Sequence, residues 1–309
     1  MNIIKEQLEN TLDLFDHPKL GTPYKGKVRD VYDLGDKLLM ITSDRISAFD
    51  KVLSTIPYKG EILNRVANFW FEKTGDEIPN HVIDNPDPQV LIAKKTKPLP
   101  VEVIVRGYIT GSLWRDFEKG AHTRYGIPFP DELKRDQKFD TPIITPTTKA
   151  EYGEHDEAIS REEIVNGLVD PAIYEKAEEY ALKLFNAGQE WALEKGLILV
   201  DTKYEFGIVN GELILVDEVH TPDSSRYWIA EEYEARSKPH RTILFTKISD
   251  DTSSIMLSIS VNNKDELARL KERFDDYGEA SIRIEDAFIK PLNGEISLNL
   301  RKGSFAVGN

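Results

Sequence analysis

Three acidic and two basic side chains lie close together in the sequence, at spacings suited to binding a divalent cation and a nucleotide: Asp201, Lys203, Glu205, Asp217 and Arg226. Asp201, Lys203 and Glu205 occupy alternate positions, so on a β-strand their side chains share one face. Carboxylates bind Mg²⁺, and lysine and arginine bind phosphates. Any one of these acids alone would also suit a solvated surface hairpin with a salt-bridged lysine. The whole set predicts a chemical site.

The turn after this strand decides which residues lie opposite one another, because Asn210-Gly211 is a strong signal for a β-hairpin. A two-residue loop would pair Val209 with Glu212 and place Glu205 and Asp217 on opposite faces. A three-residue loop or a bulge would pair Glu205 with Asp217. If both acids bind one metal ion, the second register is required.

The N-terminal part contains a predicted hairpin that turns at Gly35-Asp36 and continues into the apolar residues 37–42. Alternation places Lys27 and Arg29 on one face, where they could reach phosphates as a pair, although a solvated edge strand is the alternative. Residues 43–50 form a polar segment directly after a buried strand, where binding residues commonly lie. Taken alone, this segment could equally cap a helix.

An apolar strand is predicted over residues 101–106, with Glu102 embedded in it and Arg106 at its end. A buried acid seldom stays charged without a partner or a metal ion, so Glu102 is a candidate site residue. The following glycine-containing loop, residues 107–112, could bring backbone N–H groups and the Ser112 hydroxyl to an anion beside Arg106.

Residues 120–158 read as a long irregular segment, whose tail is either a substrate-covering loop or a solvated run of charges. Helices are predicted over residues 61–73 and, after a capping box at Ser160, to about residue 196 with a break at Asp170-Pro171. The residues predicted to form the buried stripes are Ile62, Val66, Phe69 and Trp70 in the first helix, and Leu182, Leu184, Phe185, Trp191 and Leu193 in the second.

Composition limits the function classes. A chain of 309 residues predicts two or more domains, and a formal charge of −14 opposes a general nucleic-acid binder without excluding a local cationic pocket. The absence of cysteine excludes disulfides, zinc–thiolate sites and cysteine nucleophiles. Because neither an export signal nor an apolar run of about 18 residues is visible, we expect a cytoplasmic protein with no membrane span.

Several long motifs, in order, carry a family resemblance: GKVRDVY (26–32), SDRISAFD (43–50), VIVRGYITGS (103–112), TKAEYGEHD (148–156), DTKYEFG (201–207) and VDEVHTPDSSRYW (216–228). From about residue 25 to residue 228 the chain resembles the phosphoribosylaminoimidazole-succinocarboxamide synthase (SAICAR synthetase) family. The resemblance implies a carbon–nitrogen ligase of purine biosynthesis with three small-molecule substrates: ATP, carboxyaminoimidazole ribonucleotide (CAIR) and L-aspartate. It implies Mg²⁺ as cofactor, an acyl phosphate intermediate, and the products SAICAR, ADP and phosphate.

The implied fold is α+β with two lobes, akin to protein kinases and ATP-grasp enzymes. The β-rich nucleotide-binding lobe would span residues 1–98, and the larger lobe with the metal and substrate residues would span 99–236.

The resemblance also implies a role for each matching residue. Lys27 would contact the ATP phosphates, with Arg29 beside it as a weaker candidate. Glu205 and Asp217 would hold the Mg²⁺ bound to ATP, and Lys203 would neutralise charge between the nucleotide and the acceptor.

The acceptor side is assigned in the same way. Glu102 and Asp201 would lie near the imidazole carboxylate, with or without a second Mg²⁺, and Asp50 would join them. The other implied substrate contacts are Arg106, Ser112 and Arg226 around the ribonucleotide phosphate, and Lys149, His155 and Asp223 around aspartate. His155 as a general base is one alternative. Loss of the proton from the amine after its attack is the other.

The resemblance ends near residue 235, where the family usually continues into a helical end. Here the sequence instead predicts a ββαββ module within residues 237–309, with strands at 241–246, 254–261, 280–290 and 295–300 and a helix at 263–277. We assign no chemistry to it. Two further functions stay open: a regulatory nucleotide-binding protein without turnover, and a ligase or kinase acting on another carboxylate.

Overall fold

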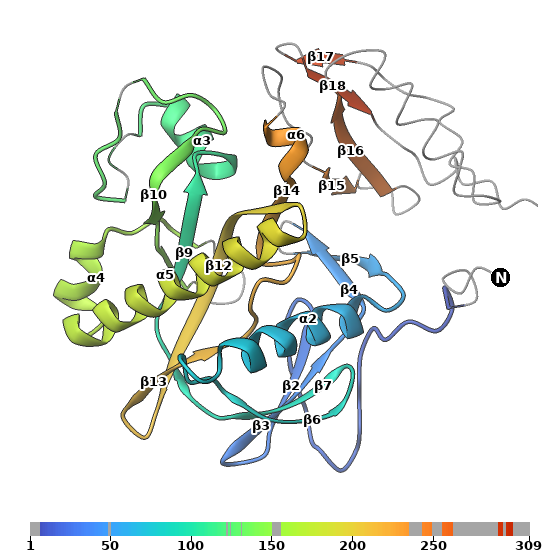
Figure 1. Cartoon of the computed structure of the whole chain (residues 1–309). Coiled ribbons are helices and arrows are strands. Elements are labelled where there is room, and N and C mark those ends of the chain that lie inside the picture. The colour runs from blue at the N-terminus through green and yellow to red at the C-terminus, as the bar shows by residue number, and fades with distance from the viewer. Residues whose placement is uncertain are drawn as a thin grey trace, which may run out of the picture. The chain divides into compact units, whose positions relative to one another are not determined.

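The computed structural model describes residues 7–48, 51–121, 123, 125–130, 132–149, 156–234, 243–248, 255–261, 290–292 and 295–298. It divides the chain into two compact units, residues 1–227 and 228–309. Helices and sheets are mixed as an α+β fold requires (Figure 1), which confirms the predicted class. The division at residues 98 and 236 stays a prediction.

The N-terminal sheet has five antiparallel strands in the order β1-β2-β3-β7-β6: β1 (Tyr24–Lys25), β2 (Arg29–Asp33), β3 (Lys37–Thr42), β6 (Val82–Asp87) and β7 (Val90–Lys94). The predicted hairpin between β2 and β3 is confirmed. β4 (Arg45–Ala48) pairs with β5 (Lys51–Thr55), so the polar segment after β3 leads into a strand. The alternative of a helix cap is also met in part, because Asp44 Oδ1 accepts a 2.9 Å hydrogen bond from the backbone N–H of Gly60 in the first turn of α2 (Lys59–Thr74).

Helix α2 (Lys59–Thr74) confirms the first predicted helix, but its buried stripe differs from the predicted one. The residues that face the interior include Leu63, Ala67, Trp70 and Phe71. Ile62 and Phe69 are 53% and 42% exposed. Phe69 lies at the side of the helix against the rings of Trp70 and Trp191. Its apolar side chain fits the helical spacing of a core residue, but it makes an aromatic contact at the surface instead.

The central sheet is built around two long neighbouring strands, β9 (Val101–Tyr108) and β12 (Leu197–Val209). Its other strands are β8 (Lys97–Pro98), β10 (Lys138–Ile144), β11 (Thr147–Thr148), β13 (Glu212–Val216) and β14 (Ser225–Ile229). β9 and β12 are antiparallel, and Asp201 lies opposite Arg106. β10 and β11 lie inside the segment predicted to be irregular. The prediction is wrong for these two strands, because an edge strand tolerates the proline and the register shift found in β10. The described residues 125–130 and 132–137 before them belong to no helix or strand, as predicted.

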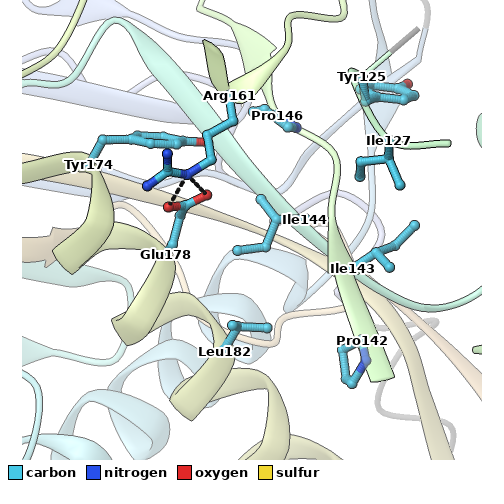
Figure 2. A pocket seen from close by; sticks show the side chains of 10 residues that line it. All are labelled: Tyr125, Ile127, Pro142, Ile143, Ile144, Pro146, Arg161, Tyr174, Glu178 and Leu182. Carbon is cyan, nitrogen blue, oxygen red and sulfur yellow. Dashed lines mark hydrogen bonds and ion pairs between the residues drawn. The ribbon is translucent and has the colours of Figure 1, made fainter. Parts of the chain in front are cut away.

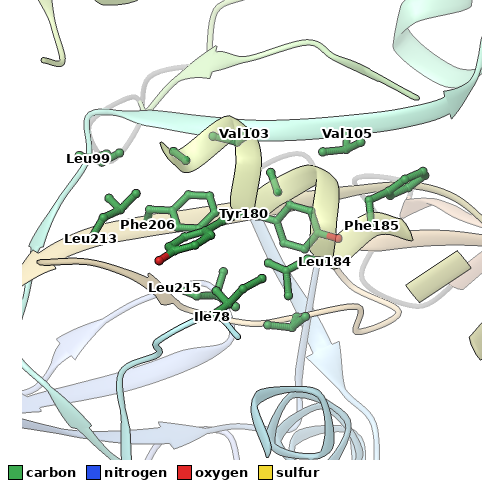
Figure 3. Packing of buried hydrophobic residues seen from close by; sticks show 14 of the residues in the cluster. Ile78, Leu99, Val103, Val105, Tyr180, Leu184, Phe185, Phe206, Leu213 and Leu215 are labelled. Carbon is green, nitrogen blue, oxygen red and sulfur yellow. The ribbon is translucent and has the colours of Figure 1, made fainter. Parts of the chain in front are cut away.

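Helix α5 (Pro171–Glu194) covers one face of β9 and β12. Tyr180, Leu184 and Phe185 of the helix are buried in one cluster with Val103 and Phe206 of the strands (Figure 3). The predicted capping box at Ser160 and the break before Pro171 are confirmed by α4 (Arg161–Gly167) and by the start of α5. Leu193, predicted to be buried, is 62% exposed because it lies on the solvent side of the last turn.

The remaining described helix of the first unit, α3 (Gly111–Glu118), follows β9 directly. In the second unit, α6 (Ala230–Glu234) precedes four strands in the order β15-β16-β18-β17: β15 (Ile243–Ile248), β16 (Ile255–Val261), β17 (Lys290–Leu292) and β18 (Glu295–Leu298). Strands were predicted at β15, β16 and β18. The strand predicted at 280–290 meets β17 only at Lys290, and the rest of it, like the helix predicted at 263–277, lies outside the described residues. Among the helices described, none is long and apolar enough to cross a bilayer.

Candidate functional site

The face of β9 and β12 that α5 does not cover carries a line of charged side chains, Glu102, Arg106, Asp201, Lys203 and Glu205, which we call the charged strip. Strand periodicity places all five on this face, as predicted for the three from β12. All but Lys203 are less than a tenth exposed. Buried charges persist only when they are paired, and each member of the strip contacts at least one other.

Lys203 joins the two glutamates of the strip. Its Nζ lies 2.7 Å from Glu102 Oε1 and 2.6 Å from Glu205 Oε1. Burial raises the pKa of Glu205, but Lys203 and Lys149, which also contacts Glu205, outweigh it and lower the pKa to about 2. Burial raises the pKa of Glu102, whose second carboxylate oxygen accepts a 3.1 Å hydrogen bond from Thr147. The suspicion that Glu102 needs a partner is thus confirmed.

Asp201 organises the two arginines predicted to bind a phosphate. Its Oδ2 accepts hydrogen bonds from Arg106 (3.2 Å) and from Arg226 (3.1 Å). Arg106 also donates to Thr145 Oγ1 at 2.7 Å and to Ser112 Oγ at 3.4 Å. These contacts bring Arg106, Ser112 and Arg226 together, with one Asp201 oxygen between two cations.

The start of α3 leaves room for this pair of arginines. A Cβ atom added to Gly111 would lie 2.6 Å from both terminal nitrogens of Arg226, and the residue has a positive φ of 60°. Only glycine suits both conditions. The glycine-containing segment after β9 therefore serves close approach of a guanidinium.

The hairpin between β12 and β13 has the two-residue register, in which Val209 pairs with Glu212 and Glu205 pairs with Val216. Asn210 and Gly211 have positive φ angles of 54° and 81°, as a type I′ turn requires. The register needed for two acids on one face of a regular strand is therefore absent from this hairpin.

Asp217 nevertheless lies near Glu205. β13 ends at Val216, and Asp217 has a φ of 67°, so strand alternation no longer sets the direction of its side chain. Burial lowers the pKa of Lys203, but Glu205 and then Asp217 raise it above its usual value. The register stated as the requirement for a shared metal ion is not the one found, and because Asp217 lies beyond the end of β13, strand alternation does not set its direction. A metal ion shared by Glu205 and Asp217 stays a prediction.

Arg29 connects the N-terminal sheet to this hairpin. Its guanidinium contacts Asp217, and its Nη2 lies 3.5 Å from Glu218 Oε2. Lys27 precedes it in the exposed turn between β1 and β2. Lys27 and Arg29 therefore lie in the same turn region, and Arg29 contacts the acids of the hairpin.

The other predicted site residues are less fully placed. Asp223 pairs with Lys59 at the start of α2, with Nζ and Oδ2 2.5 Å apart. Asp50 and His155 lie outside the described residues. Sequence reasoning missed Lys59, Thr145, Thr147 and Glu218 as contacts. The only signal for the two threonines was their alternate spacing beside Pro146, and nothing in the sequence linked Lys59 to Asp223.

The carboxylates fit Mg²⁺ bound through a nucleotide better than a preformed metal site. Within the described residues, no group of three or more histidine, aspartate or glutamate side chains converges on one point. Glu205 and Asp217 offer oxygen ligands only, and both face cations, Lys203, Lys149 and Arg29. Mg²⁺ is commonly held by one or two carboxylates together with substrate phosphates, which matches this donor set.

A cavity of about 320 Å³ lies beside this site but contains none of its residues (Figure 2). Ile144 and Pro146 line it, whereas Thr145 between them contacts Arg106. Its polar rim is the Arg161–Glu178 pair (2.8 Å). The cavity is otherwise mainly apolar.

Comparison with known proteins identifies the arrangement. Residues 22–243 match the family model described as SAICAR synthetase. A phosphoribosylaminoimidazole-succinocarboxamide synthase of Legionella pneumophila (strain Paris) is 53% identical over 222 residues, 70% of each chain. The protein of the same name in Bacteroides thetaiotaomicron is 52% identical over 225 residues, 72% of each chain.

Solved structures agree. A SAICAR synthase from Saccharomyces cerevisiae complexed with SAICAR superimposes with a TM-score of 0.65 and 38% identity, covering 72% of this chain and 80% of that one. A SAICAR synthetase in complex with ADP gives a TM-score of 0.56 and 30% identity, over 68% and 84% of the two chains.

Proposed function

The chain belongs to the SAICAR synthetase family, and from that premise we propose that the charged strip and its neighbours form the active site. The enzyme is an ATP-dependent ligase of purine biosynthesis, which joins L-aspartate to the carboxylate of CAIR and releases SAICAR, ADP and phosphate. A carboxylate is a poor acyl donor. Transfer of the γ-phosphoryl group to it gives an acyl phosphate, which the aspartate amine attacks as phosphate leaves. We expect the reaction to take place in the cytoplasm.

This route needs no protein nucleophile, so the residues bind, orient and neutralise charge. On the nucleotide side, Lys27 and Arg29 contact the phosphates, and Glu205 and Asp217 hold the Mg²⁺ that accompanies ATP. Mg²⁺ offsets the negative charge of the phosphates when bound. Burial lowers the pKa of Lys203, but the surrounding acids raise it by more. The Lys203 amine therefore stays protonated.

On the acceptor side, Arg106, Ser112 and Arg226 bind the ribonucleotide phosphate. Asp201 fixes the two guanidiniums, and Glu102 lies with it near the imidazole carboxylate. The remaining residues proposed as substrate contacts around aspartate and the acceptor are Asp50, Lys149, His155 and Asp223. The observation that carries the proposal is that Lys203 contacts both Glu102 and Glu205, so one cation links the acceptor side to the nucleotide side.

The test is ADP release from Mg²⁺–ATP, CAIR and L-aspartate, with each substrate omitted in turn. Release that depends on all three supports the ligase, and ATP binding without release would instead favour a regulatory nucleotide-binding protein. Arg106→Ala should raise the KM for CAIR by about 10- to 100-fold, the value of one or two lost charged hydrogen bonds, and leave the KM for ATP nearly unchanged. Arg65→Ala, which alters an exposed pair with Glu61, is the matched control. Normal CAIR kinetics for Arg106→Ala would refute the assigned phosphate site.

A further inference from the structure

Arg45 is the largest fully buried side chain among the described residues. Of the residues assigned to a substrate, it has a described contact only with the backbone of Lys27. Its two terminal nitrogens bind the two carboxylate oxygens of Asp30 at 2.8 and 3.2 Å, and both residues are 0% exposed. This bidentate pair is the geometry in which arginine binds a carboxylate most strongly. The remaining guanidinium donors are used on backbone carbonyls.

Those carbonyls belong to the turn between β1 and β2. Arg45 donates from Nη2 to Gly26 O at 3.2 Å and from Nε to Lys27 O at 3.1 Å. The next carbonyl, Val28 O, accepts two 2.9 Å hydrogen bonds from the backbone N–H and the hydroxyl of Ser43. Three consecutive carbonyl oxygens are therefore held against the interior.

The orientation of the carbonyls fixes the orientation of the amides. In a trans peptide, the C=O of one residue and the N–H of the next point in opposite directions, and the described chain has no cis peptide bond. With Gly26 O and Lys27 O directed inward, the N–H groups of Lys27 and Val28 point away from Arg45. Successive N–H groups with one direction, beside a lysine, form a concave site for an anion.

Residues 12–15 of the N-terminal segment also bind the Arg45–Asp30 pair and the neighbouring Asp44. Asp13 O accepts from Arg45 Nη1, and Phe15 N donates to Asp30 Oδ2 at 3.2 Å. Leu12 and Asp44 exchange two hydrogen bonds, at 2.9 Å to the carboxylate and 2.8 Å between backbones. The cluster thus fixes the turn on its inner side.

We propose that Arg45 is a positioning residue for the nucleotide: it locks the Gly26–Val28 turn with its carbonyls inward, so that its amides and Lys27 face the phosphates of ATP. This inference rests on the proposed function. Because Arg45 is fully buried, its effect on ATP must pass through the turn. Removing the lock frees the peptides to rotate and present carbonyl oxygens, which repel phosphate.

The test compares nucleotide affinities of folded variants. Replacing both charges, in Arg45→Met with Asp30→Leu, leaves no buried unpaired charge and commonly preserves stability. Arg45→Lys keeps one charge for Asp30 but lacks the fork that reaches two carbonyls. Arg65→Met is the surface control. Dissociation constants for ATP and for adenosine are measured by calorimetry, together with the melting temperature of each variant.

We expect both Arg45 variants to bind ATP more weakly, by about 10- to 100-fold for the double variant, as for a displaced binding group, with adenosine affinity unchanged. If the double variant fails to fold, Arg45→Lys decides. ATP affinity within twofold of wild type in a folded variant overturns the proposal, as does an equal loss of adenosine affinity. Lys27→Ala is measured in parallel. Unchanged ATP affinity there refutes the phosphate role of the turn itself, whereas a loss there with normal Arg45 variants refutes only the positioning role.

Discussion

Gly188→Ala should destabilise the protein, although alanine is the better helix former. Gly188 lies on the buried face of α5. An added Cβ atom would lie 2.4 Å from His220 Cε1, 2.9 Å from His220 Nδ1 and 2.7 Å from Leu199 Cδ2. All three separations are shorter than the 3.5–4.0 Å of a normal carbon contact, so a side chain or the helix must move.

His220 cannot move freely. Its Nε2 is 2.6 Å from the Tyr204 hydroxyl, its ring centroid is 4.4 Å from that of Trp70, and its φ is 53°. Alanine gains about 1 kcal/mol of helix propensity over glycine. Overpacking costs about 1–3 kcal/mol, and losing the buried hydrogen bond to Tyr204 costs about 1–3 kcal/mol more. The net loss of unfolding free energy is then about 3 kcal/mol.

Urea unfolding of the full chain measures this difference, with Gly167→Ala as the control. Gly167 ends α4 and has no neighbour within 4 Å of an added Cβ, so its substitution should be neutral or stabilise by up to about 1 kcal/mol. An unfolding free energy for Gly188→Ala equal to or above that of wild type would refute the packing argument. The KM for CAIR should also rise, because the segment that holds His220 leads into β14, which carries Arg226.

Burial lowers the pKa of His81 to about 3, so below pH 6.5 the unfolded chain binds a proton that the folded chain does not. The unfolding free energy should therefore decrease as the pH is lowered, by up to about 1.4 kcal/mol per pH unit for this group. In His81→Phe the urea midpoint should depend less on pH between pH 6.5 and 5, and an unchanged pH dependence contradicts this. Tyr174→Phe removes a buried hydroxyl that has no partner in the described structure and should stabilise by about 1 kcal/mol, whereas Tyr227→Phe, whose hydroxyl donates a 2.9 Å hydrogen bond, should destabilise by about as much in thermal unfolding. Lys203→Met should reduce ADP release by at least about 100-fold and stability by about 3–5 kcal/mol, because two buried glutamates lose their shared cation; near-normal turnover would count against the assigned role.

The charged strip could be predicted because strand alternation alone places Asp201, Lys203 and Glu205 on one face. The pairing of that face with Glu102 and Arg106 could not, since register between strands distant in sequence depends on the whole sheet. The capping box at Ser160 was also readable, because every group in it lies within four residues.

Contacts across long sequence separations escaped prediction. Arg45 was recognised only as part of a polar segment after a strand, since nothing local shows that its donors will reach the carbonyls of Gly26 and Lys27. The stripe of α2 failed for a related reason. Ile62 and Phe69 satisfy helical spacing, but the face that is buried depends on what the sheet presents to the helix.

The left-handed backbone at Asp217 restricts which sequences can supply an acid there. Aspartate and asparagine are several-fold enriched among non-glycine residues with positive φ. Asp217→Asn would therefore keep the turn and lose the charge, and Asp217→Glu would keep the charge at the cost of backbone strain. Neither exchange is conservative at this position. Variation that preserves the ligase should therefore retain aspartate here, or shift the end of β13 by a residue and rebuild the turn around a different acid.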